Sequence, residues 1–141
     1  EDVYRSLLDQ REERIIILSQ QDTALVNALQ RRAAVVLQKS LREGFGLTVA
    51  EAMWKGTPVI GGKVGGICKQ INDGENGFLV SSIDEAADRM VQLLKDEKLC
   101  RTLGDKARES VRERFLLTRY LEQYLDLFNS FETCFSLGED S

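Results

Sequence analysis

KSLREGFGLTVAEAMWKGTPVI, residues 39–60, is the stretch that decides the fold. The apolar run at 33–37 leads into it and predicts a buried strand. The glycine-flanked turn at 43–46 redirects the chain, and a short helix follows it. Gly56 ends that helix, and Pro58 opens the next strand. The stretch therefore predicts a strand, a tight turn, a helix and a second strand in succession.

This order places the N-terminus of the short helix at the carboxyl edge of a parallel sheet. The first N–H groups of a helix have no partner within it, so those of Gly46, Leu47 and Thr48 are expected to point outward. Unpaired N–H groups and the helix dipole together favour a negatively charged ligand. The sequence therefore predicts an anion site, suited to a phosphate, at this turn.

Helices and strands alternate along the rest of the chain. Strands are predicted at residues 15–18, 33–37, 58–60 and 78–80, and a glycine-rich loop at 61–66. Helices are predicted at residues 2–11, 22–31, 67–71, 82–96, 98–114 (with Gly104 as a candidate break) and 117–131. The alternation predicts an α/β fold, a Rossmann-like parallel sheet with helices on both faces. Residues 1–131 are expected to form this domain and residues 132–141 a frayed tail.

Apolar side chains at helical spacing identify the faces that are expected to be buried. The expected core-facing residues are Leu25, Val26, Leu29, Met53, Trp54, Ala86, Met90, Leu93, Leu94, Tyr120, Leu121, Tyr124, Leu125 and Phe128. Ser82 and Glu85 fit a capping box, in which each residue bonds a backbone N–H group at the start of a helix.

Length and composition exclude several classes of function. The 141 residues suit one domain, and the net charge of −4 gives no basic surface for nucleic acid. Histidine is absent, which removes every histidine-based triad, base or metal ligand from this sequence. The cysteines, Cys68, Cys100 and Cys134, lack metal-ligand spacing and indicate the reduced thiols of a cytoplasmic protein. Apolar runs fall far short of the roughly 20 residues that a membrane span needs.

Glu43 and Glu51 flank the predicted helix start and are separated by seven residues. If the helix begins near Gly46, both carboxylates are able to face one site across the turn. A carboxylate suits a sugar or ribose because it accepts two hydrogen bonds from a vicinal diol. The alternative is that the helix dipole alone favours acidic residues at this place.

Residues 43–53, EGFGLTVAEAM, resemble the E-x7-E signature of the retaining nucleotide-sugar glycosyltransferases of family 4, which have the GT-B fold. The likeness continues through GTPVI at 56–60, VGGI at 64–67 and DGENGFLV at 73–80. Within the family, residues 40–48, residues 51–56 with Trp54, and VGGICKQINDG at 64–74 resemble the trehalose synthases, which transfer glucose from a nucleotide-glucose to glucose.

The likeness implies a role for each matching residue. Glu43, the candidate catalytic residue, is expected to contact the donor sugar, and Glu51 the donor ribose. The implied donor-binding residues are Gly44, Phe45, Gly46, Leu47, Thr48 and Glu51, and the pocket-lining candidates are Arg42, Gly65 and Gly66. For the last two glycines, a mere turn of the chain is an equal alternative.

The likeness also implies the reaction. The anomeric configuration is expected to be retained by front-face attack, with the leaving diphosphate taking the acceptor proton. A double displacement with Glu43 as nucleophile is the less favoured alternative. UDP-glucose or ADP-glucose is the expected donor substrate. No cofactor is implied, and the lack of an Asp-x-Asp motif implies no metal.

The likeness covers roughly residues 15–128 and omits parts of the family's architecture. Missing are the N-terminal acceptor domain and the first strands of the donor domain, with their basic loop. The chain is therefore expected to be an incomplete C-terminal domain of a GT-B enzyme, inactive alone. Its open strand edges are expected to pair with the rest of a longer polypeptide, or else to re-pair within the chain or across a homodimer. A non-catalytic assembly module and a trehalose phosphorylase-like enzyme remain alternatives.

Overall fold

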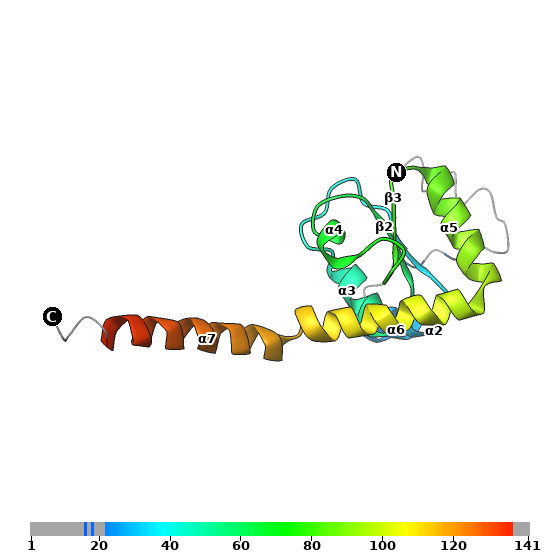
Figure 1. Ribbon diagram of the computed structural model, residues 1–141. Helices are drawn as coiled ribbons and strands as arrows, with labels where there is room; N and C mark the ends of the chain where they lie inside the picture. Colours follow the sequence, from blue (N-terminus) through cyan, green and yellow to red (C-terminus); the bar gives the residue numbers. More distant parts are fainter. Residues whose placement is uncertain (1–15, 17, 19–21, 137–141) are drawn as a thin grey trace.

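The chain folds around a three-stranded parallel sheet (Figure 1). The computed structural model describes residues 16, 18 and 22–136. The strands lie in the order β1-β2-β3. Their bounds are Val36–Gln38 for β1, Val59–Gly62 for β2 and Phe78–Val80 for β3. The predicted α/β fold with a parallel sheet is confirmed.

The helices begin where local capping signals place them. Asp22 caps the first described helix by accepting hydrogen bonds from the N–H groups of Ala24 and Leu25. The predicted capping box of Ser82 and Glu85 is present at the start of α5. The helices are α2 (Thr23–Arg32), α3 (Leu47–Trp54), α4 (Ile67–Gln70), α5 (Ile83–Lys95), α6 (Glu97–Arg114) and α7 (Leu117–Ser136).

The central strand β2 is buried on both faces, because successive side chains of a strand point in opposite directions. Val59 packs in a cluster with Met53 of α3 and Val111 of α6. Ile60 packs on the other side, in a cluster that includes Leu93 of α5. Helices therefore cover both faces of the sheet, as predicted.

Helix α6 passes through Gly104 without a break, contrary to the candidate break at this residue. The glycine lies against the end of α3, where an added Cβ would lie 3.0 Å from the carbonyl carbon of Gly56 and nearer still to its oxygen. Arg108, one turn later, donates hydrogen bonds to the carbonyl oxygens of Trp54 (3.2 Å) and Lys55 (2.8 Å). Gly104 therefore serves a close helix contact, and Arg108 caps α3.

Several core-facing predictions are wrong. On α2 the buried residue is Gln30, while Val26 and Leu29 are exposed and Leu25 is half-buried. Leu94 of α5 is also exposed, and Trp54 at the end of α3 keeps 43% of its surface accessible. The helical period identified an apolar stripe in each case, but the neighbouring element packs against a different part of the helix.

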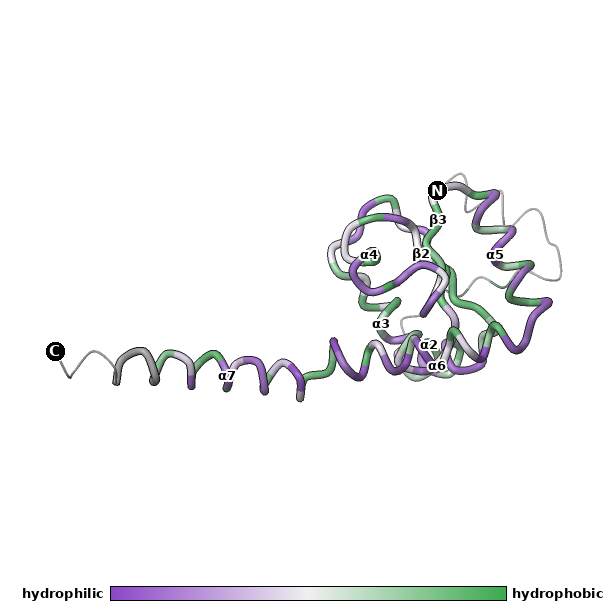
Figure 2. The backbone as a smooth tube through the Cα atoms, in the orientation of Figure 1, coloured by the Kyte–Doolittle hydropathy of each residue, from purple (hydrophilic) through white to green (hydrophobic). Residues whose placement is uncertain are grey.

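Helix α7 projects away from the sheet and extends to Ser136 rather than ending near 131 (Figure 1). Apolar and polar residues alternate along it (Figure 2). Its predicted core stripe is exposed within this chain: Tyr120, Leu121, Tyr124, Leu125 and Phe128. Within the described ranges, no helix combines the length and the apolar character that crossing a lipid bilayer requires.

The predicted helix at 2–11 lies outside the described residues. Of the predicted strand at 15–18, only Ile16 and Leu18 are described. Neither belongs to a strand, and Ile16 is 81% exposed, so the buried-strand prediction is not met at these two positions.

Candidate functional site

Two glycine-containing loops meet at the carboxyl ends of β1 and β2. The N–H group of Gly66 donates a hydrogen bond to the carbonyl oxygen of Glu43 (3.3 Å). A Cβ at Gly66 would lie 2.6 Å from both Cα and the carbonyl oxygen of Phe45, and Gly65 approaches the Glu43 carbonyl oxygen even more closely. Gly65 also has a φ of +46°. Glycine is needed at both positions because any side chain would push the two loops apart.

The turn after β1 ends in the exposed N-terminus of α3. Gly46, the N-cap, has a φ of +86°, and its carbonyl oxygen accepts the N–H group of Val49 (2.9 Å). In the described part of the chain, the N–H groups of Gly46, Leu47 and Thr48 have no acceptor. The predicted helix start is confirmed, and three backbone donors are available to an anion there.

Gln70, at the end of α4, holds this turn through its side-chain amide. The sequence did not predict this role of Gln70. Its side chain is fully buried, and its Nε2 donates hydrogen bonds to the carbonyl oxygens of Phe45 and Gly46 (3.4 Å for the latter). Its own backbone carbonyl accepts a hydrogen bond from Nδ2 of Asn76 (3.2 Å). The amide therefore holds two carbonyl groups inward, which leaves the following N–H groups directed outward.

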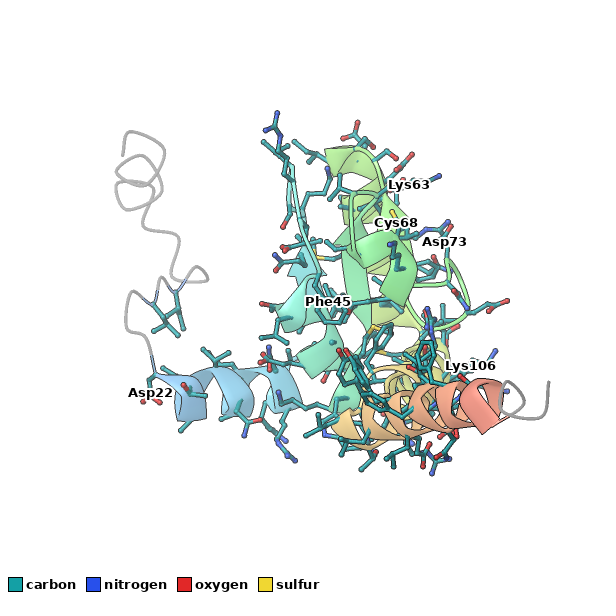
Figure 3. The ribbon with its side chains drawn as sticks, turned by 90° about the vertical axis from the view of Figure 1, so that its left-hand side faces the viewer. Asp22, Phe45, Lys63, Cys68, Asp73 and Lys106 are labelled. Carbon is teal, nitrogen blue, oxygen red and sulfur yellow. The ribbon has the colours of Figure 1, made fainter. Side chains whose placement is uncertain are left out.

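Phe45 connects the turn to the far end of α6. Its ring meets Phe115 edge to face, with the centroids 5.7 Å apart, and the guanidinium of Arg114 lies 4.9 Å from the centre of the Phe115 ring. Figure 3 views the molecule from the side on which this turn and α4 lie, with Phe45 labelled. The turn is thus held by an aromatic contact as well as by the glycine and glutamine contacts.

Glu43 is half-buried beside the same turn. One of its carboxylate oxygens accepts a hydrogen bond from the hydroxyl of Ser40 (3.4 Å), which in turn accepts one from Nε2 of Gln38 (2.9 Å). Neighbouring Arg42 is exposed and, among the described residues, has neither a hydrogen bond nor an ion pair. The structure therefore brings Glu43, Gly65 and Gly66 together with the turn and leaves Arg42 at its rim.

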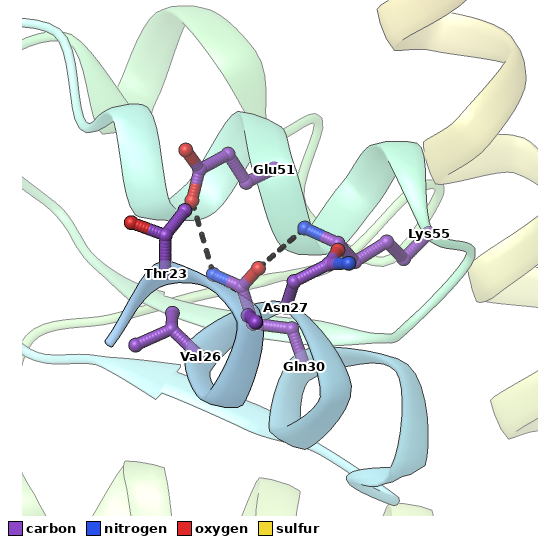
Figure 4. A pocket seen from close by; sticks show the side chains of 7 residues that line it. Thr23, Val26, Asn27, Gln30, Glu51 and Lys55 are labelled. Atoms are coloured by element: carbon purple, nitrogen blue, oxygen red, sulfur yellow. Dashed lines mark hydrogen bonds between the residues drawn. The ribbon is translucent and has the colours of Figure 1, made fainter.

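Glu51 lies on the side of α3, where it lines a pocket of about 470 Å³ between α2 and α3 (Figure 4). Oε2 of Glu51 accepts a hydrogen bond from Nε2 of Gln30 (3.3 Å), and Nζ of Lys55 donates one to Oε1 of Gln30 (2.5 Å). The pocket is lined by Thr23, Ala24, Val26, Asn27, Gln30, Glu51 and Lys55. Glu43 is not part of this lining.

Neither Gln30 nor Lys55 was predicted as a site residue. The helical period of α2 assigned its inner face to apolar residues, and a single lysine at a helix end carries no signal by itself. The sequence indicates their roles only weakly, because Gln30 is a polar residue beside the apolar stripe of α2 and Lys55 lies four positions after Glu51.

Comparison with known proteins yields one family. The family model described as Glycosyl transferases group 1 matches residues 5–110. The trehalose synthase of Pyrococcus horikoshii is 56% identical over 105 residues, which are 74% of this chain and 25% of the synthase. The trehalose phosphorylase of Grifola frondosa is 43% identical over 89 residues, 62% of this chain and 12% of the phosphorylase. This chain thus spans about a quarter of the length of the synthase.

Solved structures agree with the sequence comparison. The crystal structure of Anabaena HepE in complex with UDP and glucose superposes with a TM-score of 0.79 at 26% identity, over 92% of this chain and 37% of HepE. The solved structures that resemble this chain are GT-B glycosyltransferases. The chain belongs to the group 1 glycosyl transferases and has the Rossmann-like α/β fold found in GT-B enzymes.

Proposed function

We propose that this chain is the donor-binding part of a retaining glycosyltransferase that moves glucose from a nucleotide-glucose to a sugar acceptor, with glucose as acceptor and trehalose as product. One observation carries the proposal. The single helix α3 offers free backbone N–H groups at its N-terminus and presents Glu51 to a pocket on its side. The identity with the trehalose synthase of Pyrococcus horikoshii, 56% in the matched region, supports the choice of substrates.

The two parts of α3 suit two parts of a nucleotide-sugar. The N–H groups of Gly46, Leu47 and Thr48 bind the diphosphate, whose negative charge the helix dipole also favours. Glu51 accepts hydrogen bonds from the ribose hydroxyl groups, and its pocket takes the nucleoside. Glu43, beside the turn, accepts hydrogen bonds from the hydroxyl groups of the donor glucose.

In the proposed reaction, the bond between the anomeric carbon and the diphosphate breaks through an oxocarbenium-like state. The acceptor hydroxyl attacks from the same face, and the leaving diphosphate takes its proton, so the anomeric configuration is retained. Backbone donors directed at the leaving phosphate stabilise the charge that develops there. The acceptor is held by a part of the enzyme outside this sequence, so this chain alone binds the donor without turnover.

Calorimetric titration of the chain with UDP-glucose and ADP-glucose tests the proposal. We expect one of the two to bind, and Glu51→Ala to weaken that binding at least tenfold, because a charge-assisted hydrogen bond contributes about 1.5–3 kcal/mol. The control is Glu75→Ala, which removes an exposed glutamate outside the pocket and is expected to leave affinity unchanged. Equal losses in the two variants, or no binding by the folded chain, would refute a donor site in this part of the enzyme.

The phosphorylase relative supports a second candidate. A trehalose phosphorylase-like enzyme would place free phosphate at the N-terminus of α3, where the unpaired N–H groups suit an inorganic phosphate as well as a diphosphate group. Binding of phosphate with trehalose, and of neither nucleotide-sugar, would favour this candidate. Binding that needs the nucleoside would exclude it, because a phosphorylase has no use for the pocket at Glu51.

A further inference from the structure

The side-chain amide of Gln30 lies between two opposite charges in the pocket (Figure 4). Its Nε2 donates to Oε2 of Glu51 (3.3 Å), and its Oε1 accepts from Nζ of Lys55 (2.5 Å). Only 5% of the residue is exposed, and its backbone carbonyl accepts a hydrogen bond from the hydroxyl of Thr57 (2.6 Å). Both ends of this residue are therefore held, the backbone by Thr57 in the connection between α3 and β2, and the amide by Glu51 of α3 and by Lys55, the C-cap of α3.

The two charges determine which way the amide faces. An amide has a donor end and an acceptor end of nearly the same shape, so packing alone does not choose between them. If Gln30 were turned over, its oxygen would face the carboxylate of Glu51 and its NH₂ group would face the ammonium of Lys55. Both hydrogen bonds would be lost and two repulsions gained. Lys55 thus sets Gln30 so that its donor end meets Glu51.

This arrangement leaves a defined part of Glu51 for a ligand. A carboxylate has about four lone-pair positions, and Gln30 takes one of those on Oε2. Among the described residues, Oε1 of Glu51 has no hydrogen-bond partner. Gln30 thus holds Oε2, while Oε1 and part of Oε2 are available to accept hydrogen bonds from the two hydroxyl groups of a vicinal diol.

We propose that Gln30, held by Lys55, is a positioning residue that makes the site select ribonucleotides over 2′-deoxyribonucleotides. The inference rests on the proposed function, because it assigns the ribose to Glu51. A carboxylate fixed in this way accepts from both ribose hydroxyls at once and loses one hydrogen bond when the 2′-hydroxyl is missing. A freely rotating carboxylate adapts to either sugar and discriminates little.

The test compares the affinities of UDP and 2′-deoxy-UDP for the full chain by calorimetric titration. We expect the wild type to prefer UDP about tenfold, the value of one hydrogen bond to a charged group. Gln30→Met keeps the volume but removes both hydrogen bonds, and we expect the preference to fall to about twofold or less. Lys55→Met is expected to reduce it as well. Gln92→Met, a matched change of an exposed glutamine on α5, is expected to leave it at the wild-type value.

The ratio of the UDP affinity to the 2′-deoxy-UDP affinity separates this inference from the proposed function. If Glu51→Ala abolishes the preference but Gln30→Met keeps it, the ribose site stands and the positioning role of Gln30 is wrong. If the wild type shows no preference, or Glu51→Ala retains it, the assignment of the ribose to Glu51 is wrong and the inference fails with it. Because the ratio compares two ligands on one variant, a uniform loss of stability does not change it.

A second measurement needs no ligand. In the free protein, we expect the side-chain NH₂ protons of Gln30 to exchange with solvent at least tenfold more slowly than those of exposed Gln92, and to shift in the NMR spectra of both Lys55→Met and Glu51→Gln. An exchange rate equal to that of Gln92, or resonances unmoved by Lys55→Met, would overturn the inference whatever the titrations show.

Discussion

Gly66→Ala is predicted to displace the turn that begins α3. The added Cβ would lie 2.6 Å from two atoms of Phe45, whereas real Cβ contacts are essentially never shorter than 3.0 Å. The turn must therefore retreat by at least about 0.4 Å, and by more at the Gly44 carbonyl oxygen, which is closer still. Forcing a group into a packed site costs typically about 1–3 kcal/mol, and we expect a loss of this size in the free energy of unfolding.

Two other glycines provide matched controls. Gly104→Ala creates a comparable overlap with the Gly56 carbonyl group, but at the contact of α6 with the far end of α3. Gly44→Ala lies within the turn, yet its Cβ would meet nothing within 4 Å. We expect Gly104→Ala to lose about 1–3 kcal/mol as well, and Gly44→Ala to stay within about 0.5 kcal/mol of the wild type.

Urea unfolding measures the stability of these variants, and amide NMR measures the position of the turn. We expect only Gly66→Ala to shift the amide resonances of residues 45–48 strongly. It should also weaken nucleotide-sugar binding tenfold or more, since displacement of a binding group by a fraction of an ångström to 1 Å costs up to about 100-fold. If Gly66→Ala keeps these resonances and its stability while Gly104→Ala is destabilised, the two loops do not pack as described and the reasoning is wrong.

Four further predictions concern stability and assembly. Arg108→Met removes two hydrogen bonds from the end of α3 and should lower the free energy of unfolding by about 1 kcal/mol in thermal melts, whereas Arg101→Met on the same helix should not. Two backbone N–H groups hold the pKa of Glu85 below its ordinary value. Its contribution to the free energy of unfolding is therefore complete above about pH 4.3 and is lost as the pH falls through the lowered pKa. The free energies of unfolding of the wild type and of Glu85→Gln should become equal below that lowered pKa in an acid titration. Leu125→Lys on α7 should change stability by less than about 0.5 kcal/mol, because this side chain is 62% exposed. If the edge of β1 that has no partner strand among the described residues pairs two chains, Leu37→Lys should raise the dissociation constant of the dimer at least tenfold in sedimentation experiments; an unchanged constant would place any dimer contact elsewhere.

The features that the sequence predicted correctly are those whose causes lie within a few residues. The capping box at Ser82 needs only its own helix start, and the turn at Gly46 needs only a glycine that tolerates a positive φ before an apolar helix. The parallel strands follow from short apolar runs separated by helices. The sequence signals of these features are local, although the pairing of the strands joins residues about 20 positions apart.

The failures share a different cause, which is the identity of the packing partner. Val26 and Leu29 make an apolar stripe on α2, but the element that reaches this helix is α3, with the charged groups of Glu51 and Lys55, so Gln30 is buried instead. The stripe of α7 is equally regular, yet nothing among the described residues covers it. Periodicity identifies the apolar face of a helix but not whether this chain contains the surface that covers it.

The buried glutamines were hidden for the same reason. Gln70 acts on carbonyl groups 24 and 25 residues earlier in the chain, and Gln30 acts on side chains 21 and 25 residues later. In the sequence, Gln70 and Gln30 look like ordinary polar residues, because their partners come close to them only when the loops and helices pack together. Functional residues of this kind become visible only when the hydrogen bonds are known.

These contacts also determine how the two halves of the proposed site depend on each other. Gly46 and Glu51 are five positions apart on α3, which places them about 7.5 Å apart along a rigid helix axis. A change that tilts the whole helix, such as the loss of Arg108, therefore moves the phosphate donors and the ribose acceptor together. Gln70 and Gln30 each hold only one of them. Substitutions of Arg108 should thus weaken UDP and 2′-deoxy-UDP alike, whereas Gln30→Met should act on their ratio, and Gln70→Met on phosphate binding with that ratio preserved.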